Sequence, residues 1–410
     1  MPQETLSQAD DFTITALEDR EPWETYDKLR AGTPVVWDRV MNAWVLLDYA
    51  SCLEVETQED RFRNPYQDVP QVVVDIKGGG RNITLLAGEE HRRMRRFLMM
   101  LMTPAKVETY TQQQILPVID LLMGRVLKRG SGRADLTAEF GDQIPPRVIA
   151  ALLGMPWQDD DLINEILRLH EEIMEVIGAA FRTEEIRQRG LRISSEINGL
   201  LMPYIRQRRD SPQDDFISRC WTESPEFEGN LTEADVVAIA REIFLGGADT
   251  TVHGIANLSY LMLTDSGVRQ SLENARDAML PAAIEESMRL YGSVMYRFRV
   301  ANEDAVLGGQ KIAKDDRVIL MHSSANRDPA KYACPHMADL SRRPSNDHLA
   351  FNKGPRSCVG IHLARAEMRE SLKAVLTHMP NVRLDPDAEQ PTFRGLFMRS
   401  WRPLNVIFDS

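Results

Sequence analysis

Apolar residues recur every three or four positions over most of this chain, the spacing of one buried face of an α-helix. The longest stretch with this spacing runs from about residue 89 to 267. The pattern predicts helices over Pro22–Ala31, Glu89–Met102, Pro104–Leu127, Leu136–Leu153, Asp159–Ile177, Thr183–Gln207, Leu231–Leu263, Ala278–Tyr291 and Ile361–Leu376. Pro145 and Pro146 should perturb the fourth of these, because proline lacks the backbone N–H that a helix interior uses.

Shorter alternating segments predict a smaller β region. Pro34–Asp38 and Ala43–Leu47 are expected to pair around a polar turn, Tyr296–Leu320 is rich in strand formers, and Phe393–Phe408 has the pattern of a hairpin. We expect Arg61–Asn82 to be a long loop, since it has no clear period and carries a run of glycines, and Ala325–His348 is also poorly periodic.

We find no internal repeat, low-complexity run or linker in the chain. The pattern therefore predicts one mainly α domain over residues 1–410, with an N-terminal β-containing part of about 22–86 and a helical part of about 87–410.

Composition narrows the class of protein. The chain has 410 residues, 43% of them hydrophobic and 27% charged, as in an ordinary globular protein. A net charge of −12 disfavours nucleic acid as a partner. The N-terminus has no export signal, no apolar run is long enough to span a membrane, and the cysteines Cys52, Cys220, Cys334 and Cys358 form no CxxC pair. These features predict a cytoplasmic protein with reduced thiols.

The stretch Phe351–Gly360 carries the strongest chemical signal. Cys358 lies between Gly354 and Gly360, with Arg356 two positions before it and a predicted helix directly after it. A helix N-terminus favours a thiolate, glycines admit a flat and bulky group, and an arginine suits a carboxylate. Together these residues suggest a haem–iron ligand with a propionate contact, whereas an isolated cysteine is usually a small buried hydrophobe.

A second signal lies inside the longest predicted helix. Gly246 and Gly247 stand next to each other there and are followed by Asp249 and Thr250. Each glycine costs about 1 kcal/mol relative to alanine, so either a flat cofactor comes close or the hydrogen-bond ladder opens locally. An acid beside an alcohol can pass protons, although both side chains could instead bond to their own helix.

In the combination and order of these motifs, the chain resembles the family of cytochrome P-450 haem-thiolate monooxygenases. The shared motifs are Phe-x-x-Gly-x-x-x-Cys-x-Gly, the Asp249–Thr250 pair, Glu286-x-x-Arg289 and His91-x-x-x-Arg95. The resemblance implies a helix-rich triangular prism that holds haem b between the Leu231–Leu263 helix and the helix after Cys358. Cys358 would then be the axial ligand of the iron.

The resemblance also assigns roles to other residues. It implies that His91, Arg95 and Arg299 bind the haem propionates with Arg356, while Arg297 competes with Arg299 for that role. It makes Glu286 and Arg289 structural and leaves open whether His336 completes their cluster. It places a largely apolar substrate pocket at Leu245, Ala248, Val294, Met295 and Phe397.

The implied reaction is monooxygenation of a small hydrophobic molecule by O2, as hydroxylation or O-dealkylation, with Asp249 drawing protons and Thr250 stabilising the activated oxygen. A ferredoxin and an NAD(P)H-dependent ferredoxin reductase would supply electrons, docking on the basic residues Arg92, Arg93 and Arg96. One alternative keeps the haem but uses hydrogen peroxide directly, as a peroxygenase. A second alternative is a helical binding protein without enzyme activity, in which Cys358 is structural.

Overall fold

The computed structural model of the protein describes residues 12–67, 69–79, 81–178, 183–227 and 229–409. Its helices are α1 (Trp23–Gly32), α2 (Tyr49–Thr57), α3 (Gln71–Ile76), α4 (Gly88–Leu101), α5 (Pro104–Tyr110), α6 (Leu116–Lys128), α7 (Ile144–Leu152), α8 (Asp160–Gly178), α9 (Glu184–Asp210), α10 (Phe216–Phe227), α11 (Glu233–Gly247), α12 (Thr250–Thr264), α13 (Ser266–Tyr291), α14 (His322–Ala325) and α15 (Ile361–His378). Short 3-10 helices lie at Ile14–Leu17, Gly141–Gln143 and Gly354–Arg356, and a π-helical segment lies at Thr111–Ile115.

The strands are β1 (Val35–Asp38), β2 (Ala43–Leu46), β3 (Phe62–Arg63), β4 (Arg133–Asp135), β5 (Arg297–Ala301), β6 (Ala305–Leu307), β7 (Gln310–Ile312), β8 (Arg317–Leu320), β9 (Arg383–Leu384), β10 (Thr392–Arg394), β11 (Ser400–Arg402) and β12 (Asn405–Ile407). The largest sheet has the order β1-β2-β8-β5-β3, in which β2 and β8 are parallel and the other neighbours antiparallel. The mainly α architecture with a smaller β region is therefore confirmed.

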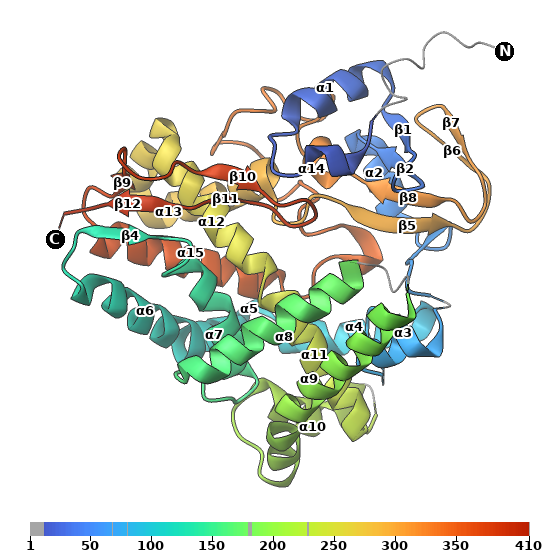
Figure 1. Cartoon of the computed structure of the whole chain (residues 1–410), viewed down its shortest axis with the longest axis horizontal. Helices are drawn as coiled ribbons and strands as arrows, with labels where there is room; N and C mark the ends of the chain where they lie inside the picture. The colour runs from blue at the N-terminus through green and yellow to red at the C-terminus, as the bar shows by residue number, and fades with distance from the viewer. Residues whose placement is uncertain (1–11, 68, 80, 179–182, 228, 410) are drawn as a thin grey trace.

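The helix α12 lies in the middle of the molecule, where it packs against α13, α15 and strand β11 (Figure 1). Most of its side chains are buried, among them Val252, Ile255, Leu258, Leu261 and Met262. A helix that is apolar on nearly all sides belongs in the core rather than on a surface. The five-stranded sheet lies to one side of the molecule near α1 and α2, and the helices α4 to α11 form the opposite part (Figure 1).

The predicted helix over Leu231–Leu263 is in fact two helices, because α11 ends at Gly247 and α12 begins at Thr250. Asp249 between them has φ −117° and ψ −44°. The glycine pair and the polar residues after it form the weak point that the sequence suggested, and the backbone hydrogen-bond ladder is interrupted there.

Five other expectations need correction. Within Arg61–Asn82 the structure contains β3 and α3, while Asp68 and Gly80 of that stretch are outside the described residues. The helix expected over Leu136–Leu153 is confined to α7, which begins at Ile144, because prolines suit the first turn of a helix and not its interior. Helix α10 was not predicted, and α13 starts earlier than expected, with a kink at Ala275.

The C-terminal hairpin is the fifth correction. Strands β10 and β11 pair as expected, with Phe393 opposite Trp401. The last strand, β12, instead pairs with β9 and with β4, the second of which is far from it in sequence. Residues that follow a hairpin can find partners elsewhere, and local patterning carries no information about such distant pairing.

Candidate functional site

The segment Phe351–Gly360 forms a tight loop before α15, held by its own backbone and by α2. The amide of Cys358 donates to the carbonyl of Phe351 at 2.8 Å, and the amide of Lys353 donates to Glu56 at 2.7 Å. Gly354 has φ +64°, and a Cβ built there would lie 2.9 Å from the carbonyl oxygen of Glu56. This glycine therefore lets the loop approach α2, which differs from the expectation that it faces a bulky group.

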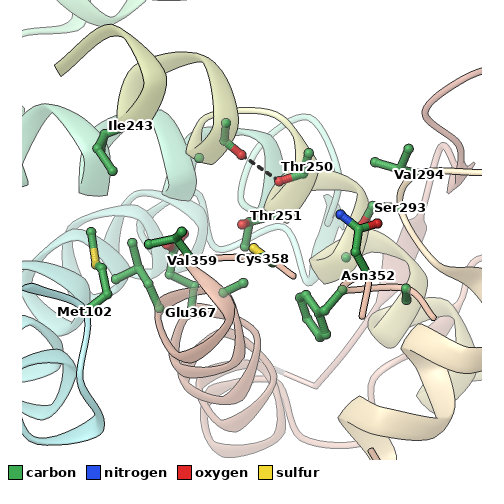
Figure 2. A pocket seen from close by; sticks show the side chains of 18 of the residues that line it. Met102, Ile243, Thr250, Thr251, Ser293, Val294, Asn352, Cys358, Val359 and Glu367 are labelled. Atoms are coloured by element: carbon green, nitrogen blue, oxygen red, sulfur yellow. Dashed lines mark hydrogen bonds between the residues drawn. The ribbon is translucent and has the colours of Figure 1, made fainter. Parts of the chain in front are cut away.

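The break between α11 and α12 faces the sulfur of Cys358 across a cavity (Figure 2). The hydroxyl of Thr250 donates to the carbonyl of Gly246 at 2.9 Å, which satisfies an acceptor that the helix break leaves without its usual partner. A Cβ on Gly246 would meet nothing within 4 Å, whereas one on Gly247 would lie 2.5 Å from Ile149. One glycine thus opens toward the cavity, and the other allows close packing on α7.

The cavity has a volume of about 300 Å³. Its walls come from α11, α12 and α15, with further residues from α4, α7 and the segments before α4 and β5. The apolar lining residues include Ile83, Leu98, Met102, Ile149, Ile243, Val294, Val359 and Leu363. A concave, mainly apolar site with a few polar groups at one place is typical of a ligand or cofactor site.

The thiol of Cys358 is in a protein interior and not at an exposed helix end. Burial raises the pKa of the Cys358 thiol, against the lowering effects of the Gly360 amide and of the cations of Arg297 and Arg95. The helix terminus alone predicts a lowered pKa for this thiol, and desolvation outweighs that effect. A positively charged iron would supply the missing stabilisation of the thiolate.

Three of the arginines close to this loop have no acidic partner among the described residues. Arg95 donates to the carbonyl and hydroxyl oxygens of Ser357 at 2.6 and 2.7 Å, Arg297 to Asn352 at 3.3 Å, and Arg299 to the carbonyl of Phe298 at 2.8 Å. Burial lowers the pKa of all three guanidinium groups. Buried cations without counter-charges favour a ligand that brings carboxylates.

Two other residues expected at the propionates have different surroundings. Arg356 already pairs with Glu59 at 2.6 Å and donates to the carbonyl of Leu86 at 2.7 Å. His91 is 2% exposed, and burial together with the cation of Arg356 lowers its pKa to about 4. His91 is therefore a neutral donor at neutral pH, while Arg356 also fastens the cysteine loop to the segment before α4.

Asp249 does not line the cavity, although its neighbours Thr250 and Thr251 do. Its carboxylate lies 3.4 Å from Nε2 of His253, one turn further along α12. Burial works to raise the pKa of Asp249, but the hydrogen bond and charge of His253 lower it on balance, with help from His170 and Arg402. The acid is thus held as an anion beside His253 and does not line the cavity.

Glu286 and Arg289 form a buried cluster, as expected for a structural role. Each is 1% exposed, and two hydrogen bonds of 2.8 Å join them. The third member is Arg342, whose Nε donates to Glu286 at 3.2 Å. His336 does not complete the cluster, because it binds Asp27 at 2.9 Å instead. Arg342 lies in an irregular segment, where spacing along the chain does not show which side chains become neighbours.

Only part of the expected substrate pocket lines this cavity. Val294 is in its wall, whereas Leu245, Ala248, Met295 and Phe397 are not among the lining residues. Alternation explains the absence of Met295, because it follows Val294 in an extended segment, where neighbouring side chains point to opposite sides. Met295 is 1% exposed, and its amide donates to the carbonyl of Phe397 at 2.9 Å.

The structure adds two acids to the cavity wall that patterning missed, Glu242 and Glu367. Glu242 accepts from Asn82 at 2.6 Å. Glu367 is 1% exposed, burial raises its pKa well above the ordinary value, and its Oε2 has no hydrogen-bond partner within the described part of the chain. A charged residue on the apolar face of a predicted helix was the available signal for Glu367.

The fold and the cysteine-centred cavity define a haem-thiolate enzyme, and comparison with known proteins agrees. Residues 32–406 match the family model described as Cytochrome P450, so the chain belongs to that family.

It is 28% identical to the mycinamicin IV hydroxylase/epoxidase of Micromonospora griseorubida over 374 residues, covering 89% of each chain. It is also 28% identical to the cytochrome P450 monooxygenase PikC of Streptomyces venezuelae, covering 92% of this chain and 89% of PikC.

Among solved structures, P450BioI in complex with an acyl carrier protein ligated to hexadec-9Z-enoic acid superposes with a TM-score of 0.83. That match has 24% identity and covers 96% of this chain and all of the other. Likeness at this identity shows the fold alone. The protein is a cytochrome P450 monooxygenase, an oxidoreductase that uses haem.

The residues present fit this cofactor. Gly246 and Gly360 both line the cavity and have open space where a Cβ would lie, and Cys358 and Arg297 line the same cavity. Arg95, Arg297 and Arg299, which have no acidic partner among the described residues, would offer positive charge to two propionates. None of the described helices is long and apolar enough to cross a membrane.

Proposed function

We propose that this enzyme inserts one oxygen atom of O2 into a small hydrophobic molecule held in the cavity between α11, α12 and α15. The observation that carries the proposal is the arrangement of Cys358 and the helix break at Thr250 on opposite walls of one apolar cavity. This arrangement offers an iron ligand on one side and hydrogen-bonding groups on the other.

We propose that Cys358 is the axial ligand and that Arg95 and Arg299 hold the propionates. Arg297 is the alternative to Arg299, and His91 and Arg356 support the same end of the cofactor. The haem, when bound, supplies oxygen activation that the thiolate promotes by donating electron density. The unpaired cations Arg95, Arg297 and Arg299 support this seating, because each lacks an acidic partner among the described residues.

We propose that Thr250 and Asp249 deliver protons to the reaction. The hydroxyl of Thr250 donates to Gly246 in the resting protein and can turn its hydrogen bond toward a ligand in the cavity. Asp249, next in sequence and 28% exposed at its side chain, can exchange protons with solvent. The position of Asp249 supports this role, because Thr250, the next residue in the chain, lines the cavity.

The lining favours an apolar substrate, because most of its side chains are aliphatic. Hydroxylation or O-dealkylation of such a molecule is the finer proposal. The names of two relatives, a hydroxylase/epoxidase and a monooxygenase, support the first of these. A peroxide-driven reaction is the second candidate, and it would not need Asp249 and Thr250.

We further propose that a ferredoxin and an NAD(P)H-dependent reductase supply the electrons. Arg92 and Arg96 on α4 are 62% and 67% exposed at their side chains, and Arg93 beside them is also exposed. Glu89 pairs with Arg92 at 2.9 Å and with Arg96 at 3.5 Å, so it offsets part of this charge. An acidic partner would be attracted to the remainder.

The iron ligand is tested by the spectrum of the reduced, carbon monoxide-treated protein. A thiolate opposite the gas gives a strongly red-shifted Soret band, which Cys358→Ala should abolish and Cys334→Ala, at an exposed cysteine, should keep. A parent-like band in Cys358→Ala would refute the assignment.

The proton role is tested with ethoxycoumarin as probe, by the product and the peroxide formed per NAD(P)H oxidised. Thr250→Ala should bind haem yet release more peroxide, and Thr250→Ser, which keeps the hydroxyl, should stay close to the parent. Equal yields in Thr250→Ala and parent would contradict the role. Faster turnover with added peroxide than with ferredoxin and reductase would favour the peroxygenase.

A further inference from the structure

The carboxylate of Asp249 has an unusual partner for its place in the fold. Asp249 is the N-cap residue of α12, where an aspartate normally accepts a hydrogen bond from an amide of the first turn. Its side chain makes no such bond. Nε2 of His253 instead lies 3.4 Å from Oδ1, and within the described residues His253 is the sole hydrogen-bonding or ion-pairing partner of this carboxylate.

His253 is fixed from its other side by the C-terminal sheet. Its Nδ1 lies 2.9 Å from the hydroxyl of Ser400 on β11. The same hydroxyl oxygen accepts from Nε of Arg402 at 3.0 Å, and Arg402 pairs with Asp142 at 3.0 Å. A strand distant in sequence therefore determines how the imidazole is oriented beside α12.

The donors of this chain run in one direction. Because Ser400 accepts from Arg402, its own hydrogen is available for Nδ1 of His253, the one other partner that this hydroxyl has among the described side chains. If Nδ1 of His253 accepts from Ser400 and the ring is neutral, the hydrogen of the imidazole is on Nε2, the nitrogen that lies 3.4 Å from Oδ1 of Asp249. The Asp142–Arg402 pair, Ser400 and His253 thus form a connected chain whose last nitrogen lies next to the acid.

We propose that His253 is a positioning residue for the proton relay, holding the Asp249 carboxylate outside the cavity through Nε2–H while Ser400 and Arg402 fix its tautomer. The inference rests on the proposed relay of Asp249 and Thr250. The lowered pKa of Asp249, to which His253 contributes most among the lowering causes, agrees with this contact.

The contact has a consequence for catalysis. A held carboxylate keeps one orientation, from which it can turn toward Thr250 and return after each proton transfer. Without His253 the carboxylate loses its one side-chain partner within the described residues and can take other orientations. Electron flow would then produce peroxide, as when the acid itself is lost.

The test compares single and double variants of the holoenzyme, with ferredoxin, reductase and ethoxycoumarin as probe. His253→Leu and Asp249→Asn should each raise the peroxide released per NAD(P)H several-fold. Their double variant should be no worse than Asp249→Asn alone, because a residue that acts through Asp249 has nothing left to position. His253→Gln, whose amide can donate from about the place of Nε2, should recover most of the lost coupling.

The haem content and the Soret band after carbon monoxide show whether each variant is folded. His378→Leu, at an exposed histidine on α15, serves as the matched control. Parent-like peroxide in His253→Leu, with a rise in Asp249→Asn, would overturn the positioning role alone. Additive losses in the double variant would also overturn it, as would equal losses in His253→Leu and His253→Gln. Parent-like coupling in Asp249→Asn would overturn the relay and this inference with it.

Discussion

Replacing Glu286 by glutamine tests how strongly burial changes the energy of an ion pair in this protein. The chain contains two pairs with the same local geometry, Glu286–Arg289 on α13 and Glu165–Arg168 on α8, each three residues apart on one helix. The first pair is 1% exposed on both sides and the second 43%. Their comparison separates the effect of burial from that of spacing.

The structure indicates what the buried substitution removes. Glu286 accepts two bonds of 2.8 Å from Arg289, one of 3.2 Å from Arg342 and one of 2.9 Å from the amide of Asp339. Glutamine keeps the shape but leaves a buried guanidinium without its counter-charge. Breaking a buried pair in this way costs about 3–5 kcal/mol, whereas Glu165→Gln at the exposed pair should cause little or no measurable change.

Urea unfolding of the haem-loaded protein provides the assay, followed by the Soret band and by tryptophan fluorescence. Because a bound cofactor can break two-state behaviour, the two midpoints are compared between variants under one set of conditions. We expect both midpoints to fall clearly in Glu286→Gln and to remain near the parent in Glu165→Gln. Equal midpoints in the two variants would refute the conclusion that burial determines the energy of this motif.

Three further outcomes can be measured. Gly354→Ala should lower the urea midpoint of the protein with and without haem, because alanine is strained at φ +64° and its Cβ would lie 2.9 Å from the backbone of α2. Gly360→Ala, which has open space beside it, should weaken haem retention alone. Equal urea midpoints of the two haem-free variants would contradict this difference. The pKa of His91 is about 4 in the folded protein against an ordinary 6.5, so as pH falls the unfolded chain binds the proton first. The free energy of unfolding of the haem-free protein should therefore decrease as pH falls from about 6.5 to 4. His91→Gln should flatten this pH dependence, and the same pH dependence in variant and parent would count against the assignment. Asn82→Asp removes the donor to Glu242, 2.6 Å away, and adds a like charge, so protease cleavage between residues 71 and 83 should become faster, and an unchanged rate would exclude this role of Asn82.

Much of the fold follows from local pattern, because the spacing of apolar residues in each helix indicates its buried face. The apolar repeats within α4, α8 and α9 predicted the bounds of those helices closely, and the run of apolar residues in α12 indicated a core helix. The pattern predicted one helix over Leu231–Leu263, and a local opening at its two glycines was one of two alternatives that the sequence left open, so the division into α11 and α12 came from the structure. Predictions failed where partners are distant in sequence, as for β12, which pairs with β4.

The candidate site shows the same division. Cys358, its glycines and Thr250 could be selected as candidates because the iron ligation and oxygen activation proposed for them restrict residue types at fixed spacings along the chain. Spacing could not show that Arg342 completes the cluster of Glu286, because an irregular segment brings it there.

Only the tertiary structure placed Ser400 beside His253, since a hydrogen bond between β11 and α12 depends on how the C-terminal strands pack on the core. The sequence by itself determined which chemistry this protein carries, because that chemistry needs particular side chains in a particular order. The packing of segments far apart in sequence determined which charges are paired and which face the cavity, because burial and distance govern electrostatic energies and neither can be obtained from spacing along the chain.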